Sequence, residues 1–440
     1  PTPSALARPA FLSIMRCMCT SDRLHELARE AVRVLLPLAA FALLLELIDT
    51  ADWNRGQTRA AGFALAGCAV FVLRGAQFPA LPARAWPYFA LASAAVVVHV
   101  VLMWPMIANP QNTPIDVGRT TQSAVVVLAQ HASIYSSPVD NQYGPGEGLS
   151  FFGGYKYGPV VPRFYMPFIR RFGPTPGIYL GNALLLLGIA CVVAALAWRA
   201  SASPTRARAT ALAAVLAALL PSVLWNEFFF AGTNDGLPTL LALLAVLGCA
   251  WDRFALAGLA LGLSLACKPL PALLLVPLMP WPRAWRQLTL GMGFGLAALL
   301  PDLWHTPREL IANLLLFNLS RPTDSTSFVH FLPAWARSYV QLAGFALIGL
   351  VSITHQRGQM RDPNRGSATY TRDLVCAVCG VIAAFLTVSK IIHHNYIIWW
   401  LPWAAVALAA TCYGGQQRVA AETAVAPREP QTPRVLSPRA

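Results

Sequence analysis

The chain has 440 residues, of which 56% are hydrophobic and only 12% are charged. A water-soluble globular protein carries about twice that charged fraction, so the composition excludes an ordinary cytosolic protein and predicts a polytopic membrane protein. The formal net charge of +14 comes from 33 basic against 19 acidic residues, and the arginines cluster between apolar runs. This pattern is typical of the positive-inside bias of membrane proteins rather than of nucleic-acid binding, so we expect no nucleic-acid partner.

Residues 1–30 are predicted to form a cytoplasmic N-terminal segment. They contain arginines mixed with acidic residues, and no small-residue cleavage site follows the first apolar run, which argues against a cleaved signal peptide. One transmembrane helix needs about 20 apolar residues, so the length allows roughly ten to twelve spans. The candidate runs are residues 31–48, 58–73, 87–107, 176–198, 209–225, 237–251, 287–303, 335–354, 373–391 and 396–413.

A longer apolar stretch over residues 254–281 carries Lys268-Pro269 near its centre. Proline removes a helical hydrogen bond and disfavours helix before it, so we expect two short helices. If the stretch crossed the membrane once, Arg283, Arg286 and the arginines at 357–372 would lie outside, against the positive-inside bias. We therefore predict a re-entrant pair of helices, each too short to span alone, with Lys268 at its outer tip.

This topology predicts an all-α transmembrane domain over residues 31–413, with both termini in the cytoplasm and a disordered tail over residues 414–440. The external face consists of a long first loop over residues 108–175, with short amphipathic helices, and of shorter segments at 226–236, 304–334 and 393–395. No internal repeat is present, which argues against a transporter built from two related halves. The nine cysteines show no disulfide or zinc spacing.

Asp116 stands in the first external loop, before a helical segment over residues 120–130. An amphipathic helix of this kind can lie flat at the membrane surface, which would hold the carboxylate at the water–lipid boundary beside a cavity. Alternatively, Asp116 simply caps the helix, although no Glu or Gln follows three residues later to complete a capping box. The residues alone leave both alternatives open.

Further along this loop, Tyr155, Lys156 and Tyr157 precede Arg163 and Arg170. The tyrosine rings suit stacking on a sugar face, and an arginine can bind a phosphate with two hydrogen bonds. The alternative is an interfacial aromatic belt with snorkelling arginines. Because arginines on the outer face run against the positive-inside bias, a local reason for them is expected.

Lys268 is a candidate for function because a lone lysine in the middle of an apolar stretch is costly. Its partner is either an anionic phosphate, which we favour, or a structural carboxylate such as Glu227 or Asp235. Either partner has to reach the outer tip of the re-entrant pair.

The segment that begins at Ser389 contains Lys390, His393 and His394. Adjacent histidines on a helix point about 100° apart and cannot both ligate one metal ion in the usual i, i+4 manner. We expect the two histidines either to hydrogen-bond a sugar or phosphate or to be ordinary interfacial residues.

The order of these motifs resembles the GT-C membrane glycosyltransferases, most closely glycosyltransferase family 87, the polyprenyl-phosphate-mannose-dependent mannosyltransferases. The resemblance extends from about residue 85 to 410, on Asp116, Ala132-Ser-Ile-Tyr135, Tyr155-Lys-Tyr157-Gly-Pro159, Asn234-Asp-Gly236, Leu256 to Gly262, Ala266-Cys-Lys-Pro269 and His393-His394-Asn395-Tyr396. It implies a GT-C-like bundle in the bacterial inner membrane that moves a hexose, mannose in this family, from a polyprenyl-phosphate donor. The acceptor is then a hydroxyl of a glycan or lipid on the external face, and the reaction inverts the anomeric carbon without a metal or cofactor.

The resemblance also implies roles for individual residues. Asp116 is the general base and Lys268 a donor-phosphate contact, with Arg163, Arg170 and Lys390 as further phosphate-binding candidates. Tyr155, Tyr157, Asn234, Asp235, His393 and His394 are substrate-binding candidates. One carboxylate suffices because a lipid phosphate leaves as a stabilised anion and needs no general acid. The alternative from another class is a polytopic transporter or lipid flippase, which would need charges strung across the bilayer, whereas most acids here gather on one face.

Overall fold

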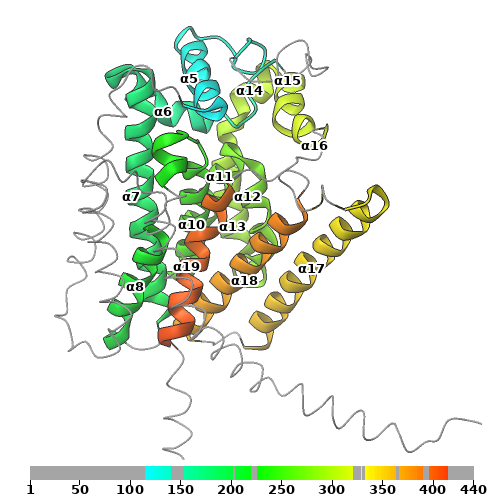
Figure 1. Ribbon diagram of the computed structural model, residues 1–440. Coiled ribbons are helices and arrows are strands. Elements are labelled where there is room, and N and C mark those ends of the chain that lie inside the picture. Colours follow the sequence, from blue (N-terminus) through cyan, green and yellow to red (C-terminus); the bar gives the residue numbers. More distant parts are fainter. Residues whose placement is uncertain are drawn as a thin grey trace, which may run out of the picture.

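The computed structural model describes residues 114–139, 153–201, 204–219, 225–320, 329, 332–362, 366–389 and 396–414, which form helices joined by turns (Figure 1). Within these ranges there is no β-strand, in agreement with the predicted all-α fold. The predicted segment 1–30, the apolar runs at 31–48, 58–73 and 87–107, and the tail after Gly414 lie outside the described residues. So do three candidate site residues, Lys390, His393 and His394.

Three described helices are long and apolar enough to cross a membrane. They are α7 (Pro174–Ala200), α17 (Ala334–Arg361) and α18 (Ser367–Val388), and each overlaps a predicted run. Shorter helices stand at three further predicted runs: α8 (Pro204–Leu219), α10 (Gly236–Ala250) and α19 (Ile397–Gly414). The total of ten to twelve spans remains a prediction.

The predicted run at 287–303 is not one helix. Instead, α13 (Trp281–Leu296) is followed by a 3-10 turn, η6 (Ala297–Leu299), and by the short helix α14 (Leu300–His305). Pro301 has no N–H to donate, so it is tolerated in the first turn of a new helix but not inside a continuing one. The apolar pattern alone did not indicate this break.

The chain turns back at Lys268, as charge parity predicted. The elements on either side are α11 (Phe254–Cys267), α12 (Pro269–Leu273) and the 3-10 turn η5 (Val276–Leu278). Two contacts show that the chain returns to the end where α11 began: Cys249 Sγ lies 3.8 Å from Met279 Sδ, and Arg283 pairs with Asp252 at 3.0 Å. Because α13 starts at this end as well, it runs parallel to α11.

Glycines allow α11 and α13 to approach closely. A Cβ atom on Gly258 would lie 2.2 Å from the Leu288 carbonyl oxygen, and one on Gly291 would lie 2.0 Å from the Ala255 carbonyl oxygen. The next glycine four residues along each helix, Gly262 and Gly295, faces the partner backbone in the same way. This small-xxx-small spacing supports close helix packing in membranes. The tightly packed pair carries Lys268 at the end of α11.

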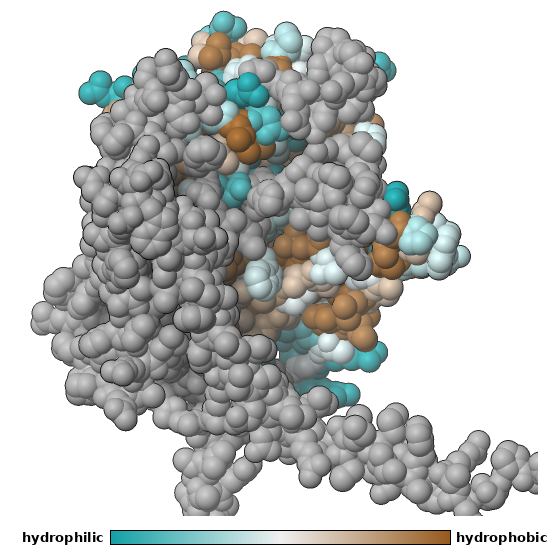
Figure 2. Space-filling model, viewed as in Figure 1, coloured by the Kyte–Doolittle hydropathy of each residue, from teal (hydrophilic) through white to brown (hydrophobic). Residues whose placement is uncertain are grey.

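The main hydrophobic core surrounds α7, which packs against α6 (Val160–Phe172), α8, α10, α18 and α19. Its largest fully buried side chains include Phe228 and the α19 residues Trp399 and Trp403. By contrast, α17 exposes large apolar side chains such as Trp335 and Leu342, and Figure 2 shows apolar residues gathered on this side of the molecule. Exposed apolar side chains of this kind are suited to contact with lipid.

A second, smaller layer covers one end of the bundle, at the top of Figure 1. It contains α5 (Asp116–Ala129), α14, α15 (Pro307–Ile311), the π-helical turn η7 (Ala312–Leu316) and α16 (Phe317–Ser320). We call it the cap layer. Its own small core consists of Ala124, Val127, Ile134, Tyr135, Val139, Tyr155, Leu310 and Leu314. Most of these segments belong to the predicted external loops, which therefore do gather at one end.

The packing of α11 on α13 can be tested with Gly291→Ala. The added methyl group is expected to lower the melting temperature of the detergent-purified protein, because overpacking costs about 1–3 kcal/mol. The matched control is Gly293→Ala on the same helix, where a Cβ atom has nothing within 4 Å. This variant should melt at the wild-type temperature or slightly above it, since alanine has the higher helix propensity. Equal melting temperatures for the two variants would contradict the close packing.

Candidate functional site

Segments that are far apart in sequence meet beneath the cap layer. The Ile115 N–H donates to the Ala231 carbonyl oxygen at 2.9 Å, which joins the start of α5 to the loop before α10. The Gly158 N–H donates to the Cys267 carbonyl oxygen at 2.7 Å, which joins the Tyr155 motif to the end of α11. Position 158 requires glycine because a Cβ atom there would lie 1.7 Å from the Ala266 carbonyl oxygen. Motifs that carried the family resemblance are therefore in direct contact.

Lys268 forms an ion pair at the centre of this junction. Its Nζ lies 2.5 Å from Oδ1 of Asp235, the fully buried residue that precedes α10. The same Oδ1 accepts the indole N–H of Trp399 on α19 at 2.8 Å. Lys268 therefore pairs with a structural carboxylate, the alternative that the sequence left open beside a phosphate.

Aromatic rings surround the ammonium group of Lys268. Its Nζ lies 4.9 Å from the ring centre of Tyr157, 5.0 Å from that of Trp399 and 5.3 Å from that of Tyr396. Cations are attracted to the faces of aromatic rings at such distances. Because 12% of the Lys268 side chain remains exposed, the ammonium group is held in place and can still be reached.

Asn234, beside Asp235, belongs to a buried hydrogen-bond cluster. Its Nδ2 donates to the Thr121 hydroxyl at 3.0 Å and to the Tyr155 hydroxyl at 3.4 Å, and these two hydroxyls lie 3.1 Å apart. Burial raises the pKa of the Tyr155 hydroxyl, while its hydrogen bonds to Thr121 and Asn234 act in the opposite direction. The cluster connects α5, the Tyr155 motif and the loop before α10. The predicted substrate-binding residues Tyr155 and Asn234 thus have hydrogen-bond partners within the protein.

Asp116 is the first residue of α5, and its side chain is half-buried. The cap position belongs to Ile115 and no side chain caps the helix, so capping does not describe the role of Asp116. Its carboxylate has no hydrogen bond or ion pair among the residues that the structure describes. Burial raises the pKa of the Tyr157 hydroxyl, and the negative charges of Asp235 and Asp116 raise it further. Tyr157 therefore experiences the charge of Asp116, while Lys268 lies beside its ring.

Arg163 and Arg170 both lie on α6. Arg163 Nη2 is 3.4 Å from Oδ2 of Asp302 on α14, an ion pair that links α6 to the cap layer. Arg170, in the last turn of α6, is exposed. Neither arginine shares an ion-pair partner with Lys268 in the described part of the chain.

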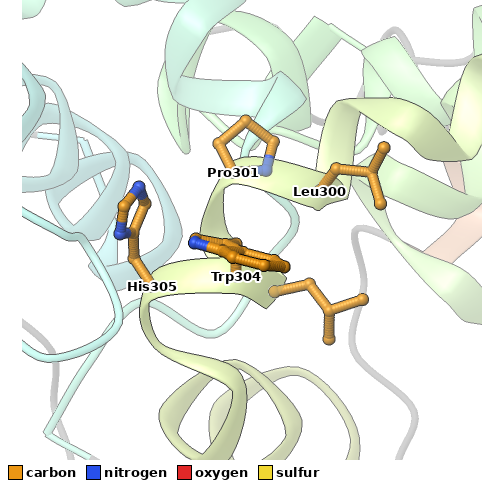
Figure 3. Close-up of a pocket in the computed structure, with 5 residues that line it drawn as sticks. Leu300, Pro301, Trp304 and His305 are labelled. Carbon is orange, nitrogen blue, oxygen red and sulfur yellow. The ribbon is translucent and has the colours of Figure 1, made fainter.

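The outer side of α14 borders an open pocket of about 400 Å³ (Figure 3). Figure 3 shows the Trp304 ring at its centre, with Leu300 and Pro301 above it and His305 beside it. Trp304 is 84% exposed. None of the predicted site residues lines this pocket, so the pocket is not part of the candidate site.

Lys156 is a buried cation that sequence reasoning did not assign to the site. Its Nζ donates to Asn313 Oδ1 at 2.7 Å and lies 4.7 Å from the ring centre of Phe317. Burial lowers the pKa of Lys156 to about 7. Asn313 lies in η7 and also donates to the Glu309 carbonyl oxygen at 2.9 Å, so Lys156 ties the Tyr155 motif to the cap layer. Two features of the sequence could have identified Lys156: it is one of very few lysines, and it stands between two tyrosines.

No three His, Cys, Asp or Glu side chains come together as metal ligands within the described ranges. The histidine pair, His393 and His394, lies outside them, so its role stays a prediction. The residues that do meet at the junction are carboxylates, a lysine and tyrosines, which suit the binding of hydroxyl and phosphate groups.

Residues 155–353 match glycosyltransferase family 87. The matched region includes the Tyr155 motif, Asp235 and Lys268, and it begins after Asp116. The match favours a glycosyltransferase over the transporter or flippase alternative.

Among solved structures, this chain is similar to ArnT from Cupriavidus metallidurans, whose crystal structure was determined bound to undecaprenyl phosphate. The two chains are 17% identical, with a TM-score of 0.46. The alignment covers 72% of this chain and 60% of the ArnT chain, so this chain spans about three fifths of the length of ArnT. No curated protein sequence matches this chain.

The ion pair beneath the cap layer can be tested with Lys268→Met. This change leaves Asp235 buried without its counter-charge and is expected to destabilise the enzyme by about 3–5 kcal/mol. The double variant Asp235→Asn/Lys268→Met should recover much of that loss, because no unpaired charge remains. Denaturant unfolding in detergent measures the free energy of unfolding of the wild type, the single variant and the double variant.

A matched control breaks an ion pair at the other end of α10. Arg283 and Asp252 are each more than half exposed, so Arg283→Met should cost no more than about 1 kcal/mol. If Lys268→Met lowers the free energy of unfolding no more than Arg283→Met does, the buried charge of Asp235 does not depend on Lys268 as proposed.

Lys156→Met tests the buried lysine through the pH dependence of stability. The folded pKa of about 7 lies below the ordinary value of 10.5, so between these two pH values the unfolded chain binds a proton that the folded chain does not. The wild-type protein therefore gains stability as the pH rises through this window. We expect the melting temperature of the wild type, relative to Lys156→Met, to rise between about pH 7 and pH 10. A difference that stays constant over this range would contradict the burial of Lys156.

Proposed function

We propose that this glycosyltransferase moves a hexose, mannose by its family resemblance, from a polyprenyl-phosphate donor to a hydroxyl of a glycan or lipid acceptor, with inversion. One observation carries the proposal: Asp116 follows Ile115, whose N–H bonds to Ala231 in the loop that leads to Asp235, the ion-pair partner of Lys268. Glycosyl transfer from a phosphate needs these two kinds of group, a base for the acceptor hydroxyl and a cation for the departing phosphate.

Asp116 is the general base in this proposal. As the acceptor oxygen attacks the anomeric carbon, its proton passes to the Asp116 carboxylate, and the bond from that carbon to the phosphate oxygen breaks. Attack from the face opposite the phosphate inverts the anomeric carbon. A lipid phosphate leaves as a stable anion, whereas a sugar leaving group needs protonation, so a second carboxyl group is not required.

Lys268 binds the donor phosphate while it stays paired with Asp235. An ammonium group has three N–H donors, and the contact with Asp235 uses one of them. Since the pair is neutral as a whole, the phosphate is held mainly by directed, charge-assisted hydrogen bonds. Asp235, for which the family resemblance implied substrate binding, is assigned a positioning role instead, because Lys268 and Trp399 share its Oδ1.

The remaining candidates keep the roles that the resemblance implies. Arg163, Arg170 and Lys390 are further phosphate-binding groups, and His393 and His394 bind the sugar or phosphate. Tyr155 shapes the site through its bonds to Thr121 and Asn234.

The position of the site supports a lipid-linked donor. The junction lies where the apolar helices α10 and α11 meet the cap layer. A lipid tail can approach such a site from the bilayer while the acceptor approaches from water. We propose that this end faces the outside of the bacterial inner membrane, with both chain termini in the cytoplasm.

Asp116→Asn is expected to lower transfer by about 10²–10⁴-fold, because the acceptor loses its base. The melting temperature should stay near that of the wild type, since the carboxylate has no partner among the described residues. The assay uses the purified enzyme in nanodiscs with a panel of polyprenyl-phosphate hexoses and octyl hexoside acceptors. Mass spectrometry detects the released polyprenyl phosphate and the new glycoside.

Asp252→Asn is the matched control, because it makes the same change at an exposed aspartate beyond the other end of α10. It should transfer at the wild-type rate. Wild-type activity in Asp116→Asn would show that Asp116 is not the base. A wild-type enzyme that uses no donor in the panel would show that the proposed donor class is wrong.

A further inference from the structure

Several tyrosines surround the junction beneath the cap layer, and most use their hydroxyls to hold the protein together. The Tyr135 hydroxyl donates to the Tyr157 carbonyl oxygen at 2.9 Å, and the Tyr165 hydroxyl donates to Asn182 Oδ1 at 2.5 Å. The Tyr155 hydroxyl is bonded within the Thr121 and Asn234 cluster. In contrast, the hydroxyl of Tyr157 has no hydrogen bond within the part of the chain that the structure describes.

Tyr157 is also the accessible member of this group. Tyr135, Tyr155 and Tyr165 are at most 2% exposed, whereas Tyr157 is partly exposed. Its position is nevertheless fixed, because its carbonyl group accepts from Tyr135 and its ring meets that of Tyr155 edge-on at 5.4 Å. An ordered, partly exposed hydroxyl without a partner among the described residues can be satisfied by water or by a ligand.

The charged groups around Tyr157 indicate which ligand atom this is. Lys268 Nζ, the proposed phosphate-binding group, lies 4.9 Å from the Tyr157 ring centre. On the basis of the proposed function, we propose that the Tyr157 hydroxyl is a catalytic hydrogen-bond donor to the phosphate oxygen that carries the sugar. The Tyr157 ring lies beside the cation that binds the phosphate, and the segment of Tyr157 bonds through Gly158 to the end of α11 that carries this cation. The breaking bond must lie near that cation.

The step balances without a proton from Tyr157. The bond between the anomeric carbon and the phosphate oxygen breaks, and its electron pair stays on that oxygen. The acceptor oxygen bonds to the same carbon and loses its proton to Asp116. The raised pKa of the Tyr157 hydroxyl keeps its own proton in place, so it acts as a donor and not as a base. Because negative charge grows on the phosphate oxygen during the step, the hydrogen bond is strongest in the transition state.

Tyr157→Phe tests this role, because it removes the hydroxyl and keeps the ring beside Lys268. Loss of one such donor typically costs about 100-fold in kcat, and KM for the donor should change by no more than about twofold. The melting temperature should not fall. The matched control is Tyr155→Phe, the same change at the neighbouring tyrosine, which breaks the bonds to Thr121 and Asn234 and should lower the melting temperature.

A modified donor separates the proposed hydrogen bond from a general effect on the site. When sulfur replaces the oxygen that bridges the sugar and the phosphate, the bridging atom becomes a weak hydrogen-bond acceptor. The ratio of wild-type to Tyr157→Phe kcat should then fall toward one.

Three results would each overturn the inference. They are an unchanged kcat in Tyr157→Phe, a loss of kcat that is equally large with the sulfur donor, and a melting temperature that falls as far as in Tyr155→Phe. Each of these three results is obtained with a wild-type enzyme that transfers hexose from the polyprenyl phosphate, so the proposed function stands. If the wild type transfers nothing from any polyprenyl-phosphate hexose, the proposed function fails, and this inference fails with it.

Discussion

A lysine placed between apolar helices requires a nearby counter-charge, because an isolated buried ammonium group is costly. Asp235 supplies it from the start of α10, and Trp399 of α19 bonds to the same carboxylate oxygen. A buried ion pair adds little net stability, since desolvation offsets most of the attraction. What the pair provides is position: it fixes an ammonium group at the end of α11, where the Tyr155 motif and the loop before α10 also meet.

Close backbone contacts make this arrangement possible, and glycine is what permits them. The Gly158 backbone lies against the end of α11, and a Cβ atom on Gly118 of α5 would lie 2.6 Å from the Gly232 carbonyl oxygen. Gly232 itself has a φ of +64°, a conformation that other residues adopt at a cost. The motifs that carry the family resemblance therefore pack together at the backbone level.

Charge parity predicted the turn at Lys268 and the gathering of external segments at one end, because the positive-inside bias acts on whole loops. It could not predict the partner of Lys268, since Glu227 and Asp235 belong to the same segment and only the folded loop brings Asp235 to the lysine. The role of Lys156 was missed because Asn313 lies 157 residues further along the chain, and no local pattern links the two. Likewise, hydropathy does not report the break in the run at 287–303, where Pro301 stands in the first turn of α14.

An acidic residue that is already paired with a cation is less suited to act as a base, so the partners of the acidic residues near the junction matter. Asp235 is fully buried against Lys268, and Asp302 pairs with Arg163. Burial raises the pKa of Glu227 to about 7, with a further contribution from Asp235. A pKa near neutrality suits a base, but geometry comes first, and Glu227 is buried, with 8% of its surface exposed. Asp116 combines a half-buried side chain with a place at the positive end of the α5 dipole. Among the described acidic residues near the junction, its carboxylate is accessible and has no ion-pair partner, which supports its proposed role.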